Sequence, residues 1–248
     1  MEEKELLLET CVLAGKIMVE NGAEMYRVED TMNRIADNYY QEEGISFVTQ
    51  TIVLMGLEST KSIQMKRISE RTTNLGKVSK VNDLSWQFSS KQIDLQELSK
   101  ALKVVLKEEP PKKTVVKIIC AAILSAALMI LLGGQWNNFF ATFLVGAGGY
   151  SVYMISTTYL KLKYVDEFLA SFVIGVLAFL MIQLKIGTSI DNMIIGSIMP
   201  LVPGVAITNT VRDLQEGHML SGISRGVEAL IIAMMIGAGI AVAFNAMS

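Results

Sequence analysis

The sequence predicts an α-helical multi-pass membrane protein with five transmembrane helices, preceded by a small cytoplasmic α+β domain. Hydrophobic residues make up 51% of the chain, and its mean hydropathy is +0.42. The chain has 22 Lys and Arg and 24 Asp and Glu residues, yet only 11 of these charged residues follow Lys117. Apolar runs beyond this point reach the about 20 residues that a spanning helix needs. We therefore expect a cytoplasmic domain over residues 1–113 and a transmembrane domain over residues 114–248.

The segment Lys107–Lys113 between the two domains combines lysines with two prolines. Pro110 and Pro111 are expected to end the preceding helix, because a proline disfavours the helical conformation in the residue before it. The lysines suit the cytoplasmic surface of a membrane. The N-terminus is acidic, so it does not resemble a signal peptide.

Five candidate spans follow, and the Lys and Arg residues of the short loops predict their orientation, because such residues favour the cytoplasmic side. The loop around Trp136 carries no charge, whereas Lys161 and Lys163 follow the second span, and Arg212 and Arg225 flank the loop before the fifth. This alternation places the N-terminus in the cytoplasm and the C-terminus outside. The expected spans are Val115–Leu132, Phe139–Leu160, Phe168–Leu184, Ile190–Thr210 and Gly222–Phe244.

The cytoplasmic domain shows both helical and strand patterns. Apolar residues recur at helical spacing in three stretches, and Asp94 with Glu97 forms a capping box that predicts the start of a fourth helix. The expected helices lie near residues 7–20, 28–39 and 75–88 and from residue 94 onward.

Strand-like composition appears between the second and third of these helices. Residues 45–54 and 63–68 are rich in β-branched and aromatic side chains, and residues 58–61 resemble a turn. The simplest prediction is a two-stranded hairpin.

The fourth span contains residues that interrupt a helix. Each proline removes a backbone donor, and glycine allows the chain to leave the helical conformation. Freed backbone groups in a membrane are tolerated where protein or water covers them, and interrupted spans often form substrate sites. A proline kink with a packing role is the alternative. The candidate substrate-binding residues are Pro200, Pro203, Gly204, Thr208, Asn209, Arg212 and Asp213.

Arg212 and Asp213 allow two interpretations. Arg212 can bind a carboxylate through two parallel hydrogen bonds. It can equally anchor the topology on the cytoplasmic side and pair with the adjacent Asp213.

Charged residues elsewhere are further candidates. Glu20, Glu24 and Arg27 lie in a dense charged stretch, which is either a solvated, paired helix face or a regulatory or gating site. Glu228 lies just inside an apolar run, where a carboxylate either marks a proton path or pairs with Arg225. Asp191 is expected to be a helix N-cap.

Several function classes find no support. The sequence has no glycine-rich phosphate loop, no serine nucleophile motif and no basic stripe. Cys11, Cys120 and His218 have no metal-ligand spacing. We therefore expect no enzymatic activity, no cofactor, no metal and no nucleic-acid partner. Five spans without an internal repeat indicate either a higher oligomer within the lipid bilayer or a second polypeptide.

Three segments resemble the bacterial threonine/serine exporter family: residues 13–31, residues 47–51 and residues 200–213. The second contains Thr49, a further gating candidate, and has Gln50 where the family commonly has proline. Family members in one polypeptide have twice as many spans. The resemblance therefore implies the larger subunit of a split exporter, whose small companion membrane subunit supplies the remaining spans.

The resemblance implies a secondary exporter of small polar metabolites in the bacterial inner membrane, driven by the proton-motive force. L-threonine and L-serine are the first expectation for its substrate, and succinate is the alternative. A membrane-anchored sensor or enzyme that acts through residues 1–113 is the competing class.

Overall fold

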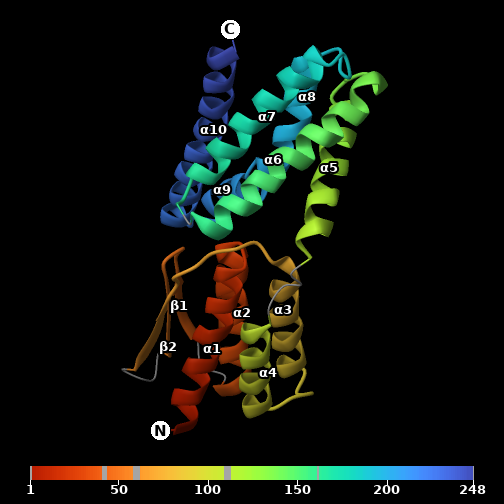
Figure 1. Cartoon of the computed structure of the whole chain (residues 1–248). Helices are drawn as coiled ribbons and strands as arrows, with labels where there is room; N and C mark the ends of the chain where they lie inside the picture. Colours follow the sequence, from red (N-terminus) through yellow and green to blue (C-terminus); the bar gives the residue numbers. More distant parts are fainter. Residues whose placement is uncertain (1, 41–43, 58–61, 109–112, 161, 248) are drawn as a thin grey trace. The chain divides into compact units, whose positions relative to one another are not determined.

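The computed structural model describes residues 2–40, 44–57, 62–108, 113–160 and 162–247 (Figure 1). The chain packs into two compact units. The first, here called the α/β unit, combines Met1–Pro110 with Gly204–Val227, and the second, the helical unit, combines Pro111–Pro203 with Glu228–Ser248. Residues 204–227, which the sequence places in the transmembrane domain, therefore pack with the N-terminal part of the chain.

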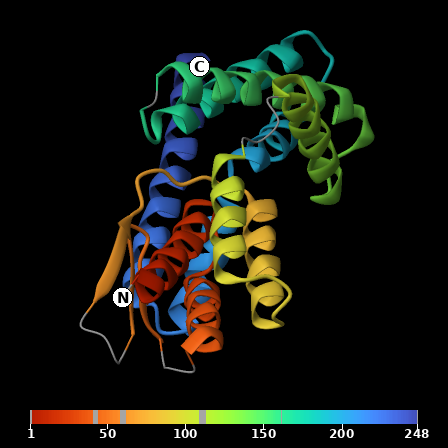
Figure 2. The ribbon, with the colours of Figure 1, turned by 90° about the horizontal axis from the view of Figure 1, so that it is seen from below.

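Four helices form the core of the α/β unit, at the positions that the periodicity predicts. Residues at the predicted apolar spacing are buried, including Leu7, Cys11 and Met18 of the first helix. Figure 2 shows these helices packed beside the sheet, with the first two helices next to the strands. Their bounds are α1 Glu2–Glu20, α2 Met25–Tyr40, α3 Leu75–Ser89 and α4 Leu95–Lys107.

The capping box at the start of α4 is present. Asp94 Oδ1 accepts the backbone N–H of Glu97 at 2.7 Å, and the Glu97 carboxylate accepts the backbone N–H of Asp94 at 2.9 Å. The backbone N–H groups of Asp94 and Glu97, which have no carbonyl partner within the helix, thereby form hydrogen bonds.

The sheet has three antiparallel strands in the order β1-β2-β3, so the predicted two-stranded hairpin is wrong. The run 45–54 is divided at Thr49, whose hydroxyl oxygen accepts the backbone N–H groups of Thr51 and Ile52 at 3.3 and 3.1 Å. Such local side-chain bonds compete with the strand ladder and close a tight turn. The turn expected at 58–61 lies outside the described residues. The strands are β1 Gly44–Val48, β2 Ile52–Leu57 and β3 Ile63–Arg67.

The helical unit contains helices long and apolar enough to cross a membrane. Four single helices meet this condition, and a fifth span exists only if a bent pair of helices counts as one. Four of the five predicted spans are thus continuous helices among the described residues. They are α5 Thr114–Leu131, α6 Phe139–Tyr159 with the preceding 3-10 turn η1 Trp136–Asn138, α7 Val165–Gln183 and α10 Met219–Met247.

Small residues let two of these helices, α5 and α6, and one shorter helix of the same unit pack closely, as membrane packing favours. A Cβ atom added to Gly146 of α6 would lie 2.4 Å from Ser125 Oγ of α5. One added to Gly196 would lie 2.7 Å from the Ser125 carbonyl oxygen. Gly196 belongs to α8, Ile190–Ile198. The glycines therefore let α6 and α8 pack directly against α5.

The start of α8 differs from the prediction. Its N-cap is Ser189, whose hydroxyl accepts the backbone N–H of Asn192, whereas Asp191 lies in the first turn. Asn138 also holds this loop, because its Oδ1 accepts the backbone N–H groups of Thr188 and Ser189 at 2.7 and 3.3 Å. The polar backbone before α8 is thereby satisfied from within the helical unit.

Candidate functional site

The predicted interruption of the fourth span is present. After α8 comes a 3-10 turn, η2 Met199–Leu201, that contains Pro200. Val202 then adopts an extended conformation with φ −64° and ψ 129°, and a separate helix, α9 Gly204–Gln215, begins after Pro203. The interruption therefore separates an apolar helix of the helical unit from a polar helix of the α/β unit.

Helix α9 packs on the turn that connects α1 to α2. Its buried side chains are polar: Asn209 is 6% exposed, and Asp213 is fully buried. Asn209 Nδ2 donates to the Gly22 carbonyl oxygen at 2.9 Å. Asp213 Oδ1 accepts the backbone N–H of Met25 at 2.9 Å. Two candidate substrate-binding residues are thus hydrogen-bonded to residues 22–25.

The geometry of this turn follows from its sequence. Gly22 has φ +89°, a conformation that a glycine adopts without strain. The backbone N–H groups of Gly22 and Ala23 bond back to the carbonyl oxygens of Val19 and Met18, and Asn21 Nδ2 donates to the Ile17 carbonyl oxygen. The α1 carbonyls are thus capped. The carbonyl oxygens of Gly22 and Ala23 accept bonds from the 204–227 segment.

Arg225 completes the buried contact. Its Nη2 donates to the Ala23 carbonyl oxygen at 2.7 Å, and its Nε lies 3.4 Å from Asp213 Oδ2. Asp213 therefore pairs with Arg225, and the sequence-based pairing of Asp213 with Arg212 is wrong. Both partners are buried, so neither charge is screened by solvent. Glu228 is half-buried in α10, in the part that belongs to the helical unit.

Glu24 lies between two guanidinium groups. Its carboxylate oxygens lie 2.7 Å from Arg212 Nη1 and 3.1 Å from Arg27 Nε. Burial favours the neutral acid, but a backbone N–H, Arg212 and Arg27 together outweigh it and hold the pKa of Glu24 below its ordinary value. Arg27 therefore pairs with Glu24, and Asp30, in the next turn of α2, pairs with Arg34.

A cavity of about 590 Å³ opens beside this charge cluster, between the α1–α2 turn, α3 and α9. It brings together Glu24 and Arg27 from one predicted set with Gly204, Thr208 and Asn209 from the other. Its wall thus contains both charges, a hydroxyl and an amide, alongside apolar side chains. The remaining lining residues are Gly22, Leu75, Val78, Ser79, Asn82 and Val205.

The family model described as "Putative threonine/serine exporter" (ThrE) matches residues 9–247. The chain belongs to this exporter family. The match spans the described parts of both units, so it includes the α1–α2 turn, the cavity wall and the four long apolar helices. Neither the comparison with curated proteins nor that with solved structures found a match.

The other site residues predicted from the sequence do not line this cavity. Pro200 and Pro203 lie at the interruption. Arg212 is not part of the cavity wall but donates a hydrogen bond to Glu24, which is. Glu20 lines a separate groove with Asn21 and Lys77. Thr49 closes the β1–β2 turn.

Sequence reasoning missed two contacts of the 204–227 segment. Gln50 is 4% exposed; its Nε2 donates to the Ser221 carbonyl oxygen at 3.2 Å, and its Oε1 accepts from Arg71. Glu29 accepts the backbone N–H of Val48 at 3.1 Å and lies 3.9 Å from His218. In the sequence, these contacts were indicated only by the polar Gln50 within a strand-like run.

The environment of Glu29 differs from that of Glu24. Burial raises the pKa of Glu29, and His218 and the Val48 N–H offset only part of this effect. The buried carboxylate of Glu29 has a backbone hydrogen bond and a histidine at 3.9 Å, whereas that of Glu24 lies between two guanidinium groups. The cost of burying the negative charge is therefore offset less at Glu29 than at Glu24.

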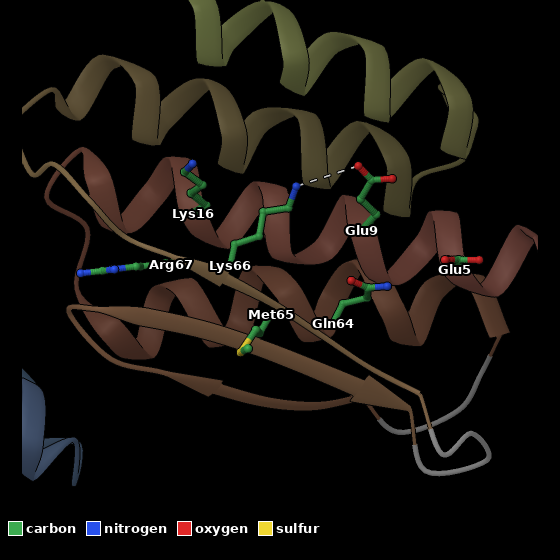
Figure 3. A pocket seen from close by; sticks show the side chains of 7 residues that line it. All are labelled: Glu5, Glu9, Lys16, Gln64, Met65, Lys66 and Arg67. Carbon is green, nitrogen blue, oxygen red and sulfur yellow. Dashed lines mark ion pairs between the residues drawn. The ribbon is translucent and has the colours of Figure 1, made fainter.

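A second groove, of about 370 Å³, lies between α1 and β3 (Figure 3). Figure 3 shows Lys66 extending towards Glu9, and the two charged groups lie 3.9 Å apart. None of its lining residues belongs to the predicted site. Mixed charges along an exposed strand are typical of a solvated surface.

Metal binding finds no support in the described part of the chain, where no group of three His, Cys, Asp or Glu residues is placed to hold an ion. The cavity beside Glu24 joins two charged groups, a hydroxyl and an amide in one wall, so it is the candidate site for a small polar molecule.

Proposed function

We propose that this chain is a membrane subunit of a secondary exporter of L-threonine and L-serine. The observation that carries the proposal is the cavity beside Glu24, because its wall offers a partner for each group of a hydroxy amino acid. Family membership and the long apolar helices support the exporter class. We further propose that the α/β unit faces the cytoplasm, where the substrate is collected.

The polar groups of the wall suggest how such a substrate binds. Arg27 can hold the substrate carboxylate, and Glu24 can hold its ammonium group. Thr208 and Asn82 can bond the side-chain hydroxyl. Thr208 donates its own hydroxyl to the Gly204 carbonyl oxygen at 2.9 Å, which leaves its oxygen lone pairs for a substrate donor.

Succinate is the second candidate substrate. Two guanidinium groups, Arg27 and Arg212, lie at Glu24. A dicarboxylate could bind them only by displacing the Glu24 carboxylate. The competing sensor class predicts ligand binding at the same cavity without transport, so binding and flux have to be measured separately.

The complete exporter, as we propose it, contains a small companion membrane subunit and uses the proton-motive force. Glu228 is the proposed proton-coupling residue, since it lies in an apolar helix. In this arrangement the present chain binds substrate by itself but exports it only with its companion.

Labelled threonine, serine and succinate test the proposal in two measurements. Calorimetry on the full chain in lipid nanodiscs measures binding, and efflux from proteoliposomes, with and without the companion and a pH gradient, measures transport. We expect threonine and serine to bind and to be exported only when both subunits are present. Binding without efflux in the complete system would favour the sensor class.

A variant pair ties these results to the cavity. Arg27→Gln should lower threonine affinity by at least about tenfold, which corresponds to ~1.4 kcal/mol, because a charged hydrogen-bond partner is lost. Arg67→Gln removes an exposed arginine of β3 that lies outside this cavity and should leave affinity unchanged. Equal affinities for both variants would place the site elsewhere.

A further inference from the structure

Helix α9 has an inverted polarity. The side chains that it buries against the α/β unit, Asn209 and Asp213, are polar. Its exposed stripe is apolar: Ile207 is 46%, Val211 53% and Leu214 37% exposed. These three residues follow the i, i+4, i+7 spacing of one helix face. A helix on the surface of a water-soluble unit shows the opposite arrangement.

The inward polar side of α9 is fully explained by its contacts with the α1–α2 turn. Asn209 and Asp213 bond to Gly22 and Met25, and Arg225 neutralises the Asp213 charge. Of the outward apolar stripe, Leu214 lies against Gly222 at the start of α10, whereas the side chains of Ile207 and Val211 stay 46% and 53% exposed. An exposed apolar stripe of this kind marks an interaction surface.

The length of α9 excludes one role for this stripe. Its 12 residues extend about 18 Å at 1.5 Å per residue, well short of the roughly 30 Å of bilayer hydrocarbon. The extended Val202 also prevents α9 from continuing α8 as one straight rod. Helix α9 can therefore lie along a membrane surface but cannot cross it alone.

The chain on both sides of α9 leads directly into apolar helices. Only Val202 and Pro203 separate α9 from η2, and only residues 216–218 separate it from α10, which is long and apolar enough to span a membrane. Both ends of α9 are thus held near a bilayer. Arg212, whose side chain is 49% exposed, lies next to Val211 and suits the phosphate-rich headgroup layer.

We propose that α9 is an interfacial helix that inserts Ile207, Val211 and Leu214 into the boundary between the headgroups and the acyl chains of the bilayer. Its polar side then holds the α1–α2 turn, so the helix fastens the α/β unit to the membrane surface. This inference rests on the membrane location of the family and is independent of which metabolite the protein exports.

Spin-label accessibility in the full chain, reconstituted into lipid vesicles, tests this placement. Cys120 is exposed and has to be replaced by alanine. Cys11 can remain, because it is buried and burial raises the pKa of its thiol, which keeps it unreactive. Labels are then placed at single cysteines in Ile207→Cys and Val211→Cys.

Matched positions calibrate the measurement. Met234→Cys, on an exposed apolar position of α10, reports the lipid environment, and Ser90→Cys, on an exposed polar position after α3, reports water. We expect labels at 207 and 211 to collide several-fold more often with oxygen, which partitions into lipid, than with a water-soluble nickel chelate. At position 90 we expect the nickel chelate to collide more often than oxygen.

Two outcomes would overturn the proposal. Nickel-chelate collisions at 207 and 211 equal to those at 90 would place the stripe in water. Low collision rates with both reagents would show that protein, either the helical unit or a second polypeptide, covers it. The collision rates do not depend on whether the chain binds an amino acid. A failure of the proposed transport function would therefore be distinguishable from a failure of this membrane placement.

Discussion

Asp213 of α9 caps the N-terminus of α2. Its Oδ1 accepts the backbone N–H of Met25, a residue 188 positions away in the sequence. The first N–H groups of a helix have no partner inside it, and a carboxylate there is also favoured by the helix dipole. The cap of α2 is therefore supplied by α9. The α1–α2 turn and the helix after the interruption thus form one structural element.

The buried Asp213–Arg225 pair should be important for stability. Asp213→Asn retains the volume and an acceptor for Met25 but removes the carboxylate charge beside the buried Arg225. Breaking a buried ion pair in this way costs about 3–5 kcal/mol. We expect a lower unfolding midpoint and faster hydrogen exchange at the Met25 amide. Asp191→Asn, at an exposed first-turn acid of α8, is the control and should change little. Matching midpoints for the two variants would contradict this role.

The interruption between α8 and α9 can be tested by restoring helix-forming residues. Pro203→Ala with Gly204→Ala should favour a continuous helix and abolish efflux at matched expression. A Cβ at Gly204 meets no atom within 4 Å, so the loss would not come from a clash. Gly237→Ala, which also places its Cβ in open space, is the control. Near-normal efflux of the double variant would identify the interruption as a packing kink.

The environment of Glu24 predicts a pH dependence. Because its pKa in the folded protein lies below the ordinary value of 4.5, ionised Glu24 stabilises the fold above that pH. This contribution is lost as the pH falls through the folded pKa. Arg212→Gln removes one of the groups that lower this pKa. Its destabilisation should therefore be present at neutral pH and disappear in acid, measured as the difference in unfolding midpoint from the unmodified protein. A pH-independent difference would indicate a packing effect.

The proposed orientation predicts which surfaces react from outside the cell. In a background without Cys120, Asn137→Cys and Ala246→Cys should react with an impermeant maleimide in intact cells. Ser90→Cys, on an exposed position of the α/β unit, should react only after permeabilisation. Labelling at position 90 in intact cells would reverse the orientation.

Local patterns predicted much of the fold. Helical spacing located α1 to α4, the capping box located the start of α4, and apolar runs located α5, α6, α7 and α10. These features depend on neighbours within one or two turns, which the sequence displays directly. The division of residues 45–54 into two strands, β1 and β2, was not predicted, because the Thr49 hydroxyl closes a turn inside a run of strand-forming residues.

The ion pairs could not be predicted in the same way. Proximity in the sequence suggested a pair between Arg212 and Asp213. Adjacent residues on a helix, however, point to different sides of it. The structure joins Arg212 to Glu24 instead and Asp213 to Arg225. The ion-pair partners of Arg212 and Asp213 thus depend on how segments distant in the sequence pack together.

The sequence by itself determined that the chain belongs to the threonine/serine exporter family, that it contains several long apolar runs and that its fourth hydrophobic run is broken between residues 200 and 204. Only the tertiary structure decided what the residues after the break contact. Hydropathy and helix-breaking residues act over a few neighbouring positions. In contrast, the bonds of Asn209 and Asp213 require the α1–α2 turn, which folding brings to them from the other end of the chain.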